Sequence, residues 1–270
     1  MELSLHNIFF AFFLTMLAGL STGIGSALAF FTKRTNQKFL SGALGFSAGV
    51  MIYVSTIEIF AKARESLAAV YGSTKGYWIT TITFFAGIAV IGIIDKLVPE
   101  TGNPHEMHDV DEMDSPGDSS KALLRMGLFS ALAVTIHNFP EGLATFMGAL
   151  HDPTMGISIT VAIAIHNIPE GIAVSVPIYY ATGNRRKAFI YSFLSGLSEL
   201  VGAVIGFFLL RTILNDAMFG IVFAAVAGIM VYISLDELLP AAEKYGKHHI
   251  AIAGVIAGMA VMALSLMMFT

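Results

Sequence analysis

Long apolar segments separated by short polar ones repeat along the whole chain. Eight of these segments are long enough to cross a bilayer as helices, which takes about 20 apolar residues. They lie at about 8–31, 39–60, 77–95, 123–150, 154–180, 188–210, 217–238 and 249–269. The pattern predicts an all-α polytopic membrane protein in which residues 1–270 form one transmembrane domain. The polar stretch at 96–122 is predicted to be a flexible loop.

The basic residues predict how the spans are oriented. The loops that follow spans 1, 3, 5 and 7 hold 11 of the 15 Lys and Arg residues, and the loops on the other side hold 4. Because basic loops stay in the cytoplasm, we predict an inner-membrane protein with both termini outside and the 96–122 loop inside. The first span has no basic leader and no clear cleavage site, so we interpret it as a retained helix.

One segment of the chain recurs in the second half. Residues 48–59 read AGVMIYVSTIEI and residues 227–238 read AGIMVYISLDEL, with six identical positions. The two copies would cross the membrane in opposite directions, so spans 1–3 and 6–8 are predicted to form an inverted repeat around a hairpin of spans 4 and 5. This architecture is typical of alternating-access transporters. GxxxG pairs at 19/23, 45/49 and 254/258 predict seams of close helix packing.

Two nearly identical hexapeptides lie in the middle of spans 4 and 5. Residues 137–142 read HNFPEG and residues 166–171 read HNIPEG. Each copy falls about 20 Å from either end of its helix, at the depth where an ionisable group costs most. In a helix, the His, Asn and Glu of one copy share a face, and the i, i+4 spacing would bring the imidazole to the carboxylate of its own copy. The Pro frees a backbone carbonyl, and the Gly allows helices to approach closely.

A further carboxylate, Glu199, lies in the middle of span 6, on a narrow face with Ser195, Gly202 and Gly206 that suits close packing. Imidazole, amide and carboxylate groups together suit a borderline divalent cation. The candidate metal ligands are His137, Asn138, Glu141, His166, Asn167, Glu170 and Glu199. In the alternative interpretation, these groups only hydrogen-bond one helix to another. Because ligands bind metal in their deprotonated form, metal binding should be coupled to proton release.

Composition excludes several classes of function. The chain has no Cys, which excludes disulfides, thiolate metal sites and Cys nucleophiles. Its formal net charge is −4 with no basic tract, which argues against a nucleic-acid partner.

Ionisable groups near the predicted span ends and in the 96–122 loop are candidate entry, exit or sensing residues, with ordinary hydrated groups as the alternative. They are Glu58, His105, His108, Asp236 and Glu237.

The paired hexapeptides, the Glu in span 6 and the eight spans resemble the ZIP family of divalent-metal transporters, and most of all its bacterial zinc transporters, over nearly the whole chain. The resemblance implies a two-metal centre. One ion would be held by His137, Glu141, His166 and Glu170, and the other by Asn138, Asn167 and Glu199, with Glu141 and Glu170 bridging. It also implies uptake into the cytoplasm by an elevator-like motion of spans 1, 4, 5 and 6 past spans 2, 3, 7 and 8.

The main expectation is therefore a secondary transporter of Zn²⁺, with Fe²⁺, Mn²⁺, Co²⁺ and Cd²⁺ as further candidate substrates, and not an enzyme. Two alternatives are an intramembrane metal-dependent hydrolase, in which the metal would activate water, and a metal-gated channel. The inverted repeat and the absence of an HExxH motif favour transport over hydrolysis. The expected partners are divalent metal ions and the lipid bilayer, and a second copy of the chain is a candidate for a homodimer.

Overall fold

The computed structural model describes residues 4–29, 37–97, 119–210, 215–245 and 248–268. All elements within these ranges are helices, and none of the described residues is in a strand. They are α1 (Leu5–Ala29), α2 (Gln37–Tyr53), η1 (Val54–Ile59), α3 (Phe60–Tyr71), α4 (Ser73–Leu97), α5 (Ser119–His151), α6 (Pro153–Thr182), α7 (Arg185–Gly196), α8 (Ser198–Leu210), α9 (Asp216–Ile233), η4 (Ser234–Leu238), α10 (Leu239–Tyr245) and α11 (His248–Met267). The elements η1 and η4 are π-helical turns.

Seven helical segments in the described part of the chain are long and apolar enough to cross a membrane. Each corresponds to one of the predicted spans, so the all-helical, multi-pass membrane class is confirmed. The remaining predicted span corresponds to α5, which has 33 residues but is not among the seven. The predicted loop at 96–122 is shortened by α4 and α5 at its two ends, and its histidines His105 and His108 lie outside the described residues.

The helix hairpin of spans 4 and 5 is confirmed. Helix α5 ends at His151 and α6 begins at Pro153, so a single residue separates them. That residue, Asp152, is an N-cap whose Oδ1 accepts hydrogen bonds from the backbone N–H groups of Thr154 at 2.7 Å and Met155 at 3.4 Å. The Pro at the first helical position has no N–H that would need a partner. Both helices continue through the Pro of their hexapeptide, Pro140 and Pro169.

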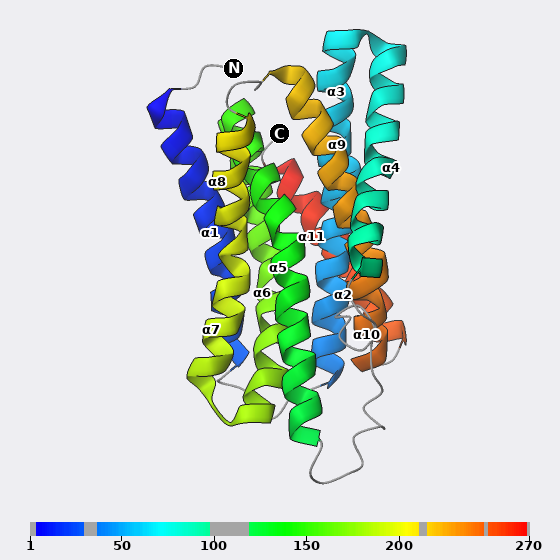
Figure 1. Cartoon of the computed structure of the whole chain (residues 1–270). Coiled ribbons are helices and arrows are strands. Elements are labelled where there is room, and N and C mark those ends of the chain that lie inside the picture. Colours follow the sequence, from blue (N-terminus) through cyan, green and yellow to red (C-terminus); the bar gives the residue numbers. More distant parts are fainter. Residues whose placement is uncertain (1–3, 30–36, 98–118, 211–214, 246–247, 269–270) are drawn as a thin grey trace.

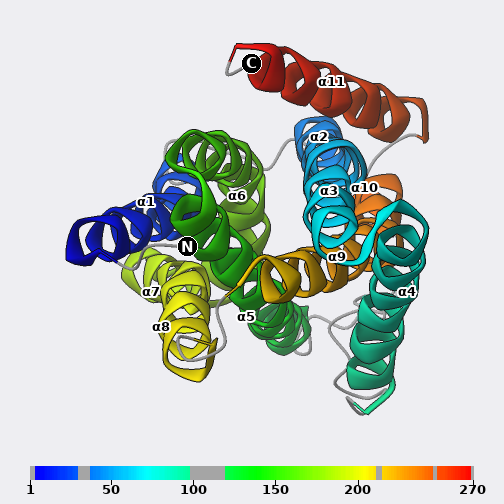
Figure 2. The same cartoon turned by 90° about the horizontal axis from the view of Figure 1, so that it is seen from above.

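The helices form two bundles. In one, α5 and α6 pack against each other and against α1, α7 and α8. In the other, α2 packs against α11 and α10, and α9 packs against α3 and α4. Seen from above, these groups lie on opposite sides of the molecule (Figure 2), and the first residues of α1 and the last of α11 lie toward the same end (Figure 1). The bundles meet where α2 contacts α6 and α9 contacts α5. The two hexapeptide helices therefore lie at the boundary.

Glycines set the closest helix crossings. A Cβ on Gly142 of the first hexapeptide would collide with the Glu199 carbonyl oxygen on α8, and a Cβ on Gly171 of the second would collide with the Thr22 carbonyl oxygen on α1. The hexapeptide glycines thus bring α8 against α5 and α1 against α6. All three predicted GxxxG pairs also lie in close packing: the α1 pair against α7, and the other two pairs at the α2–α11 crossing.

Spans 2 and 7 are longer than predicted. They continue past positions 60 and 238 to Tyr71 and Tyr245, each through a π-helical turn. The expectation that Glu58 lies near a span end is therefore wrong, because about 20 Å of helix follows it. The extension α3 is held by packing against α4 and α9, and the Ser66 hydroxyl donates to the Asp216 carbonyl at 2.7 Å.

Span 6 crosses as one segment, Arg185–Leu209, as predicted, with a one-residue break between α7 and α8 at Leu197. The backbone stays helical there, since the Leu197 N–H donates to the Phe193 carbonyl at 3.1 Å and the Val201 N–H donates to the Leu197 carbonyl at 3.2 Å. At the break, the Ser195 hydroxyl donates to the Ser192 carbonyl at 2.7 Å, and the Ser198 hydroxyl donates to the Ser195 carbonyl at 2.6 Å. Glu199 lies two residues after the break.

Candidate metal site

The seven predicted ligands are all buried in the middle of the first bundle. Their exposed fractions are 1% or less, although five of the seven are His or Glu side chains. Helices α5, α6 and α8 carry them: α5 packs against α6, and the close crossing at Gly142 brings α8 against α5. Ionisable groups this deep in a membrane protein need compensation from each other or from an ion. Their shared location confirms that the hexapeptides and Glu199 belong to one polar cluster.

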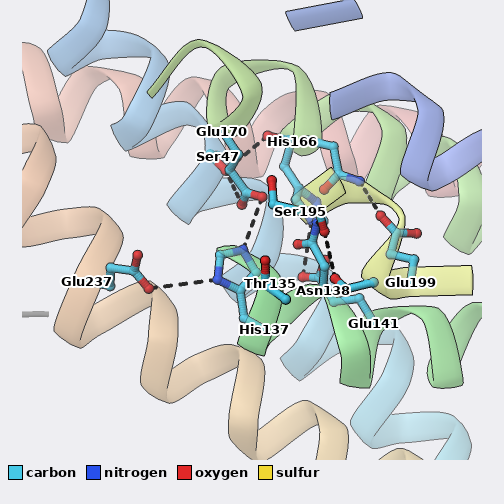
Figure 3. A network of polar contacts seen from close by, with 12 residues as sticks. Ser47, Thr135, His137, Asn138, Glu141, His166, Glu170, Ser195, Glu199 and Glu237 are labelled. Atoms are coloured by element: carbon cyan, nitrogen blue, oxygen red, sulfur yellow. Dashed lines mark hydrogen bonds and ion pairs between the residues drawn. The ribbon is translucent and has the colours of Figure 1, made fainter. Parts of the chain in front are cut away.

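The imidazoles and carboxylates pair between the two hexapeptides. His137 Nε2 lies 3.0 Å from Glu170 Oε2, and His166 Nε2 lies 3.2 Å from Glu141 Oε1 (Figure 3). The expected pairing within one copy is wrong, for a geometric reason. In the antiparallel hairpin, the His of each copy is level with the Glu of the other, and both faces point into the space between the helices. Each imidazole therefore pairs with the carboxylate that faces it from the other helix, and not with the carboxylate four residues further along its own helix.

The two asparagines link the hexapeptides to the rest of the first bundle. Asn167 Nδ2 donates to Glu199 Oε1 on α8 and to the Ala18 carbonyl on α1 at 3.1 Å. Asn138 Nδ2 donates to the carbonyl of Ser195 at 3.4 Å, just before the break in span 6. Each amide NH₂ group thus donates to a neighbouring helix, which leaves the amide oxygen available as an acceptor.

Several electron-pair donors of this cluster have no hydrogen-bond partner among the described residues, although they are buried. They are Asn138 Oδ1, Glu141 Oε2, His166 Nδ1, Asn167 Oδ1 and Glu199 Oε2. Buried polar atoms are normally satisfied, so unsatisfied ones need an explanation. Oxygen and imidazole nitrogen atoms are the donors that divalent zinc accepts. The chemistry of this set therefore fits a dication.

No three His, Asp or Glu side chains among the described residues stand close enough to hold one metal ion as they are placed here. The crossed pairs explain this, because each imidazole is turned toward one carboxylate of the other copy. The two ligand sets implied by the family resemblance thus stay predictions. The structure brings their seven members into one cluster without arranging them around an ion.

Two residues of the second bundle reach the cluster. Ser47 on α2 donates its hydroxyl to the His166 carbonyl at 3.3 Å and to Glu170 Oε1 at 3.4 Å. Glu237 in η4 lies with its Oε2 3.7 Å from His137 Nδ1 (Figure 3). Sequence analysis included Glu237 among the candidates but missed Ser47, because a Ser in an apolar helix is an ordinary packing residue. Its position one residue before the recurring segment was the only available signal.

The other two described candidates have different surroundings. Glu58 in η1 lies near Lys62 and Glu65 on the same helical segment. Asp236 lies beside Tyr232, whose hydroxyl is 3.4 Å from Asp95 Oδ2 on α4. Both groups thus lie on the second bundle.

Comparison with known proteins places the chain in a family. The family model described as ZIP Zinc transporter matches residues 96–266. A zinc transporter ZupT from Clostridium perfringens is 61% identical over 279 residues, which cover 98% of each chain. One from Chlorobium chlorochromatii is 63% identical over 265 residues, covering 98% of this chain and 99% of the relative.

A third relative, the zinc transporter ZupT of Chlorobaculum parvum, is 64% identical over 265 residues, covering 97% of this chain and 98% of the relative. Proteins of this family are transporters and not enzymes, which confirms the expectation that the chain is not a hydrolase. The match extends over nearly the whole chain and includes the hairpin and both hexapeptides. The chain belongs to the ZIP family of zinc transporters.

Proposed function

We propose that the protein is a secondary transporter that takes up Zn²⁺ into the cytoplasm through the cluster on α5, α6 and α8. The observation that carries this proposal is the burial of two imidazoles, two amides and three carboxylates at 1% exposure or less in the middle of the membrane-spanning bundle. A cluster kept only for structure would not leave so many of its oxygen and nitrogen atoms without partners. The names of the relatives, all zinc transporters, support zinc as the substrate.

Zinc would bind by taking the place of the crossed contacts. Each His–Glu pair holds one nitrogen and one oxygen about 3 Å apart, and zinc needs its ligands at about 2.0–2.2 Å. A small rotation of each side chain would turn the facing atoms from one another toward a shared ion. Glu141 and Glu170, one from each helix, would bridge two ions, and Asn138, Asn167 and Glu199 would complete the second site.

The contacts between helices support an inverted repeat of eight spans. The recurring segments contain the equivalent residues Gly49 and Gly228, and both set close crossings: Gly49 against the Val255 carbonyl in span 8, and Gly228 against the Phe84 carbonyl in span 3. Exchanging spans 1–3 with 6–8 converts one crossing into the other. It also converts the packing of α1 on α6 into that of α8 on α5. A π-helical turn interrupts both recurring segments.

The division into two bundles supports the elevator-like motion. Spans 1, 4, 5 and 6 form the bundle that carries the cluster, and spans 2, 3, 7 and 8 form the other. The polar contacts that cross the boundary near the cluster are few and long, from 3.3 to 3.7 Å. Contacts of that length are weak, so sliding of the first bundle along the second would break them at little cost. Both termini would lie outside the cell.

Uptake of a panel of divalent ions into proteoliposomes tests the proposal. We expect saturable entry of Zn²⁺, and slower or absent entry of Fe²⁺, Mn²⁺, Co²⁺ and Cd²⁺, measured with and without an imposed pH gradient. Zinc-dependent conductance that does not saturate would indicate the channel alternative. No flux of any of the five ions, from protein shown to be folded, would contradict the proposed function.

The pH dependence of zinc binding is a separate prediction. Carboxylates and imidazoles bind metal only when deprotonated, so protons and Zn²⁺ compete for the cluster. Lowering the pH from 8 to 5 should therefore weaken binding, by about tenfold per pH unit for each proton displaced. Isothermal titration calorimetry of purified protein in two buffers of different ionisation enthalpy measures both the affinity and the number of protons released. An affinity that is flat across this range would contradict coupled deprotonation.

A further inference from the structure

A shallow groove of about 440 Å³ is lined by residues of α7 and of its N-cap. The first residues of α7 lie next to the turn that joins this helix to α6 (Figure 1). The lining of the groove combines polar and apolar side chains: Asn184, Arg186, Lys187, Ile190, Tyr191 and Leu194. None of these residues belongs to the candidate metal cluster, and no step of the transport proposal uses the groove. A groove with one cationic end and one apolar end on a membrane-spanning segment has a distinct chemistry.

The cationic end is built by the start of α7. Helix α6 ends at Thr182, and its C-cap Gly183 has a φ of 63°, in the left-handed region that favours glycine. Asn184 then caps α7, and its Oδ1 accepts the Lys187 backbone N–H at 3.0 Å. The cap places Arg185, Arg186 and Lys187 together in the first turn.

Positive charge in the first turn of a helix is unfavourable, because the helix dipole is positive there. Arg185 is partly compensated, since its guanidinium lies 5.6 Å from the centre of the Tyr179 ring. No ion pair among the described residues neutralises Arg186 or Lys187, which line the groove. An anion at this end would therefore be stabilised by two side-chain cations and by the helix dipole.

The apolar end follows the same helix into the membrane. Arg186, Ile190 and Leu194 are spaced i, i+4 and i+8, so they form one row about 12 Å long. Ile190 is 41% exposed and Leu194 is 55% exposed. Both belong to the apolar segment Arg185–Leu209, which is long enough to span the bilayer. The row thus runs from a charged residue near the membrane surface to apolar residues that face lipid.

We propose that this groove binds one anionic phospholipid. The phosphate of the headgroup would accept hydrogen bonds from Arg186 and Lys187, and an acyl chain would lie along Ile190 and Leu194. A free phosphate ion would use the cationic end alone and would leave the apolar row uncovered. A zwitterionic lipid would bring its own cation next to two others. The match of charge at one end and of apolar surface at the other therefore selects an anionic lipid. The proposal does not depend on transport of zinc.

Native mass spectrometry of the full chain tests the site. The protein in detergent is mixed with phosphatidylglycerol, phosphatidylcholine or inorganic phosphate, and the spectrum shows which of them stays bound after the detergent is removed. We expect one phosphatidylglycerol molecule to be retained preferentially, and millimolar inorganic phosphate not to displace it. Each removed cation should weaken retention by about fivefold, so Arg186→Gln with Lys187→Gln should weaken it by about 25-fold. The matched control is Lys96→Gln, which removes one charge from an exposed residue in the last turn of α4, outside the groove.

A second variant keeps the test independent of folding at the start of α7. Ile190→Ser with Leu194→Ser leaves the charges in place and should weaken retention of phosphatidylglycerol while leaving any binding of inorganic phosphate unchanged. Equal retention of phosphatidylcholine and phosphatidylglycerol, displacement by phosphate, or full retention in either double variant would overturn the proposal. The same loss in Lys96→Gln as in Arg186→Gln would also overturn it, because it would show attraction to the surface as a whole.

Discussion

The two hexapeptides differ in one letter, yet the structure gives them different neighbours. Their ionisable groups are equivalent, since each His pairs with the Glu of the other copy at 3.0–3.2 Å. Their amides are not: Asn167 reaches a carboxylate, Glu199, while Asn138 reaches only a backbone carbonyl. The second imidazole nitrogen also differs, because that of His137 faces Glu237 across the boundary between the bundles.

This difference shows that the two copies share their residue types and differ in their surroundings. Through Asn167, the second copy reaches α1 and α8 of its own bundle. It also reaches the other bundle, where Ser47 on α2 donates to the His166 carbonyl and to Glu170 Oε1. The first copy reaches the other bundle through His137 and η4. Both copies therefore lie at the boundary, and the variants below test whether the difference between their neighbours affects zinc binding and transport.

The largest effect is expected where the copies are equivalent. Glu141→Ala and Glu170→Ala should each lower zinc uptake by at least about 100-fold, because each removes a carboxylate from the shared cluster and leaves a buried imidazole without its partner. Uptake into proteoliposomes measures the loss. An effect of one variant that is much smaller than that of the other would break the equivalence of the crossed pairs.

Thr135→Ala is the matched control for both carboxylate variants. Thr135 lies on α5 near the cluster (Figure 3), but its hydroxyl donates within its own helix, to the Ala131 carbonyl at 2.7 Å. Uptake should stay within about twofold of the parent protein. Full uptake by the double variant Glu141→Ala, Glu170→Ala would exclude the two-metal proposal altogether.

An intermediate effect is expected where the amides differ. Asn167→Ala removes a donor to the Glu199 carboxylate and should lower zinc affinity by about 10- to 100-fold. Asn138→Ala removes a donor to a backbone carbonyl and should lower it by less than about tenfold, with a change in metal preference. Competition between Zn²⁺ and Co²⁺ in binding assays measures both quantities. Equal losses in the two variants would show that the asymmetry of the neighbours has no functional consequence.

Residue types and depth were sufficient to predict much of this site. The mid-span position of both hexapeptides and of Glu199 predicted that their polar side chains share one buried cluster, because ionisable groups at that depth are rare without a function. Their role as metal ligands stays a prediction. The predicted hairpin of spans 4 and 5 turns at Asp152 and Pro153, where capping and proline chemistry act locally. The GxxxG pairs predicted close helix crossings, because glycine has no side chain and lets two helix backbones approach each other.

Features that depend on how neighbouring helices are aligned with one another could not be predicted. The i, i+4 rule describes one helix, so it missed that the facing helix offers a closer carboxylate to His137 and His166. Hydropathy ended span 2 near position 60, because the following segment is amphipathic. The helix nevertheless continues to Tyr71, since α4 and α9 cover it. The break at Leu197 had no sequence signal beyond the serines and glycine around it.

The smallest effect is expected at the boundary between the bundles, where the two recurring segments can be compared. Glu237→Gln keeps the shape of the side chain but removes the charge that faces His137 Nδ1 at 3.7 Å, so it should lower the maximal rate of uptake by about three- to tenfold with little change in zinc affinity. Glu58→Gln is the matched control, since Glu58 holds the equivalent place in the other recurring segment and lies near Lys62. It should change the rate by less than about twofold.

Initial rates of uptake across a range of zinc concentrations separate maximal rate from affinity. A lowered affinity in Glu237→Gln would make that carboxylate a ligand of the bound ion, and an equal loss of rate in Glu58→Gln would mean that both π-helical turns act on transport from opposite sides of the membrane.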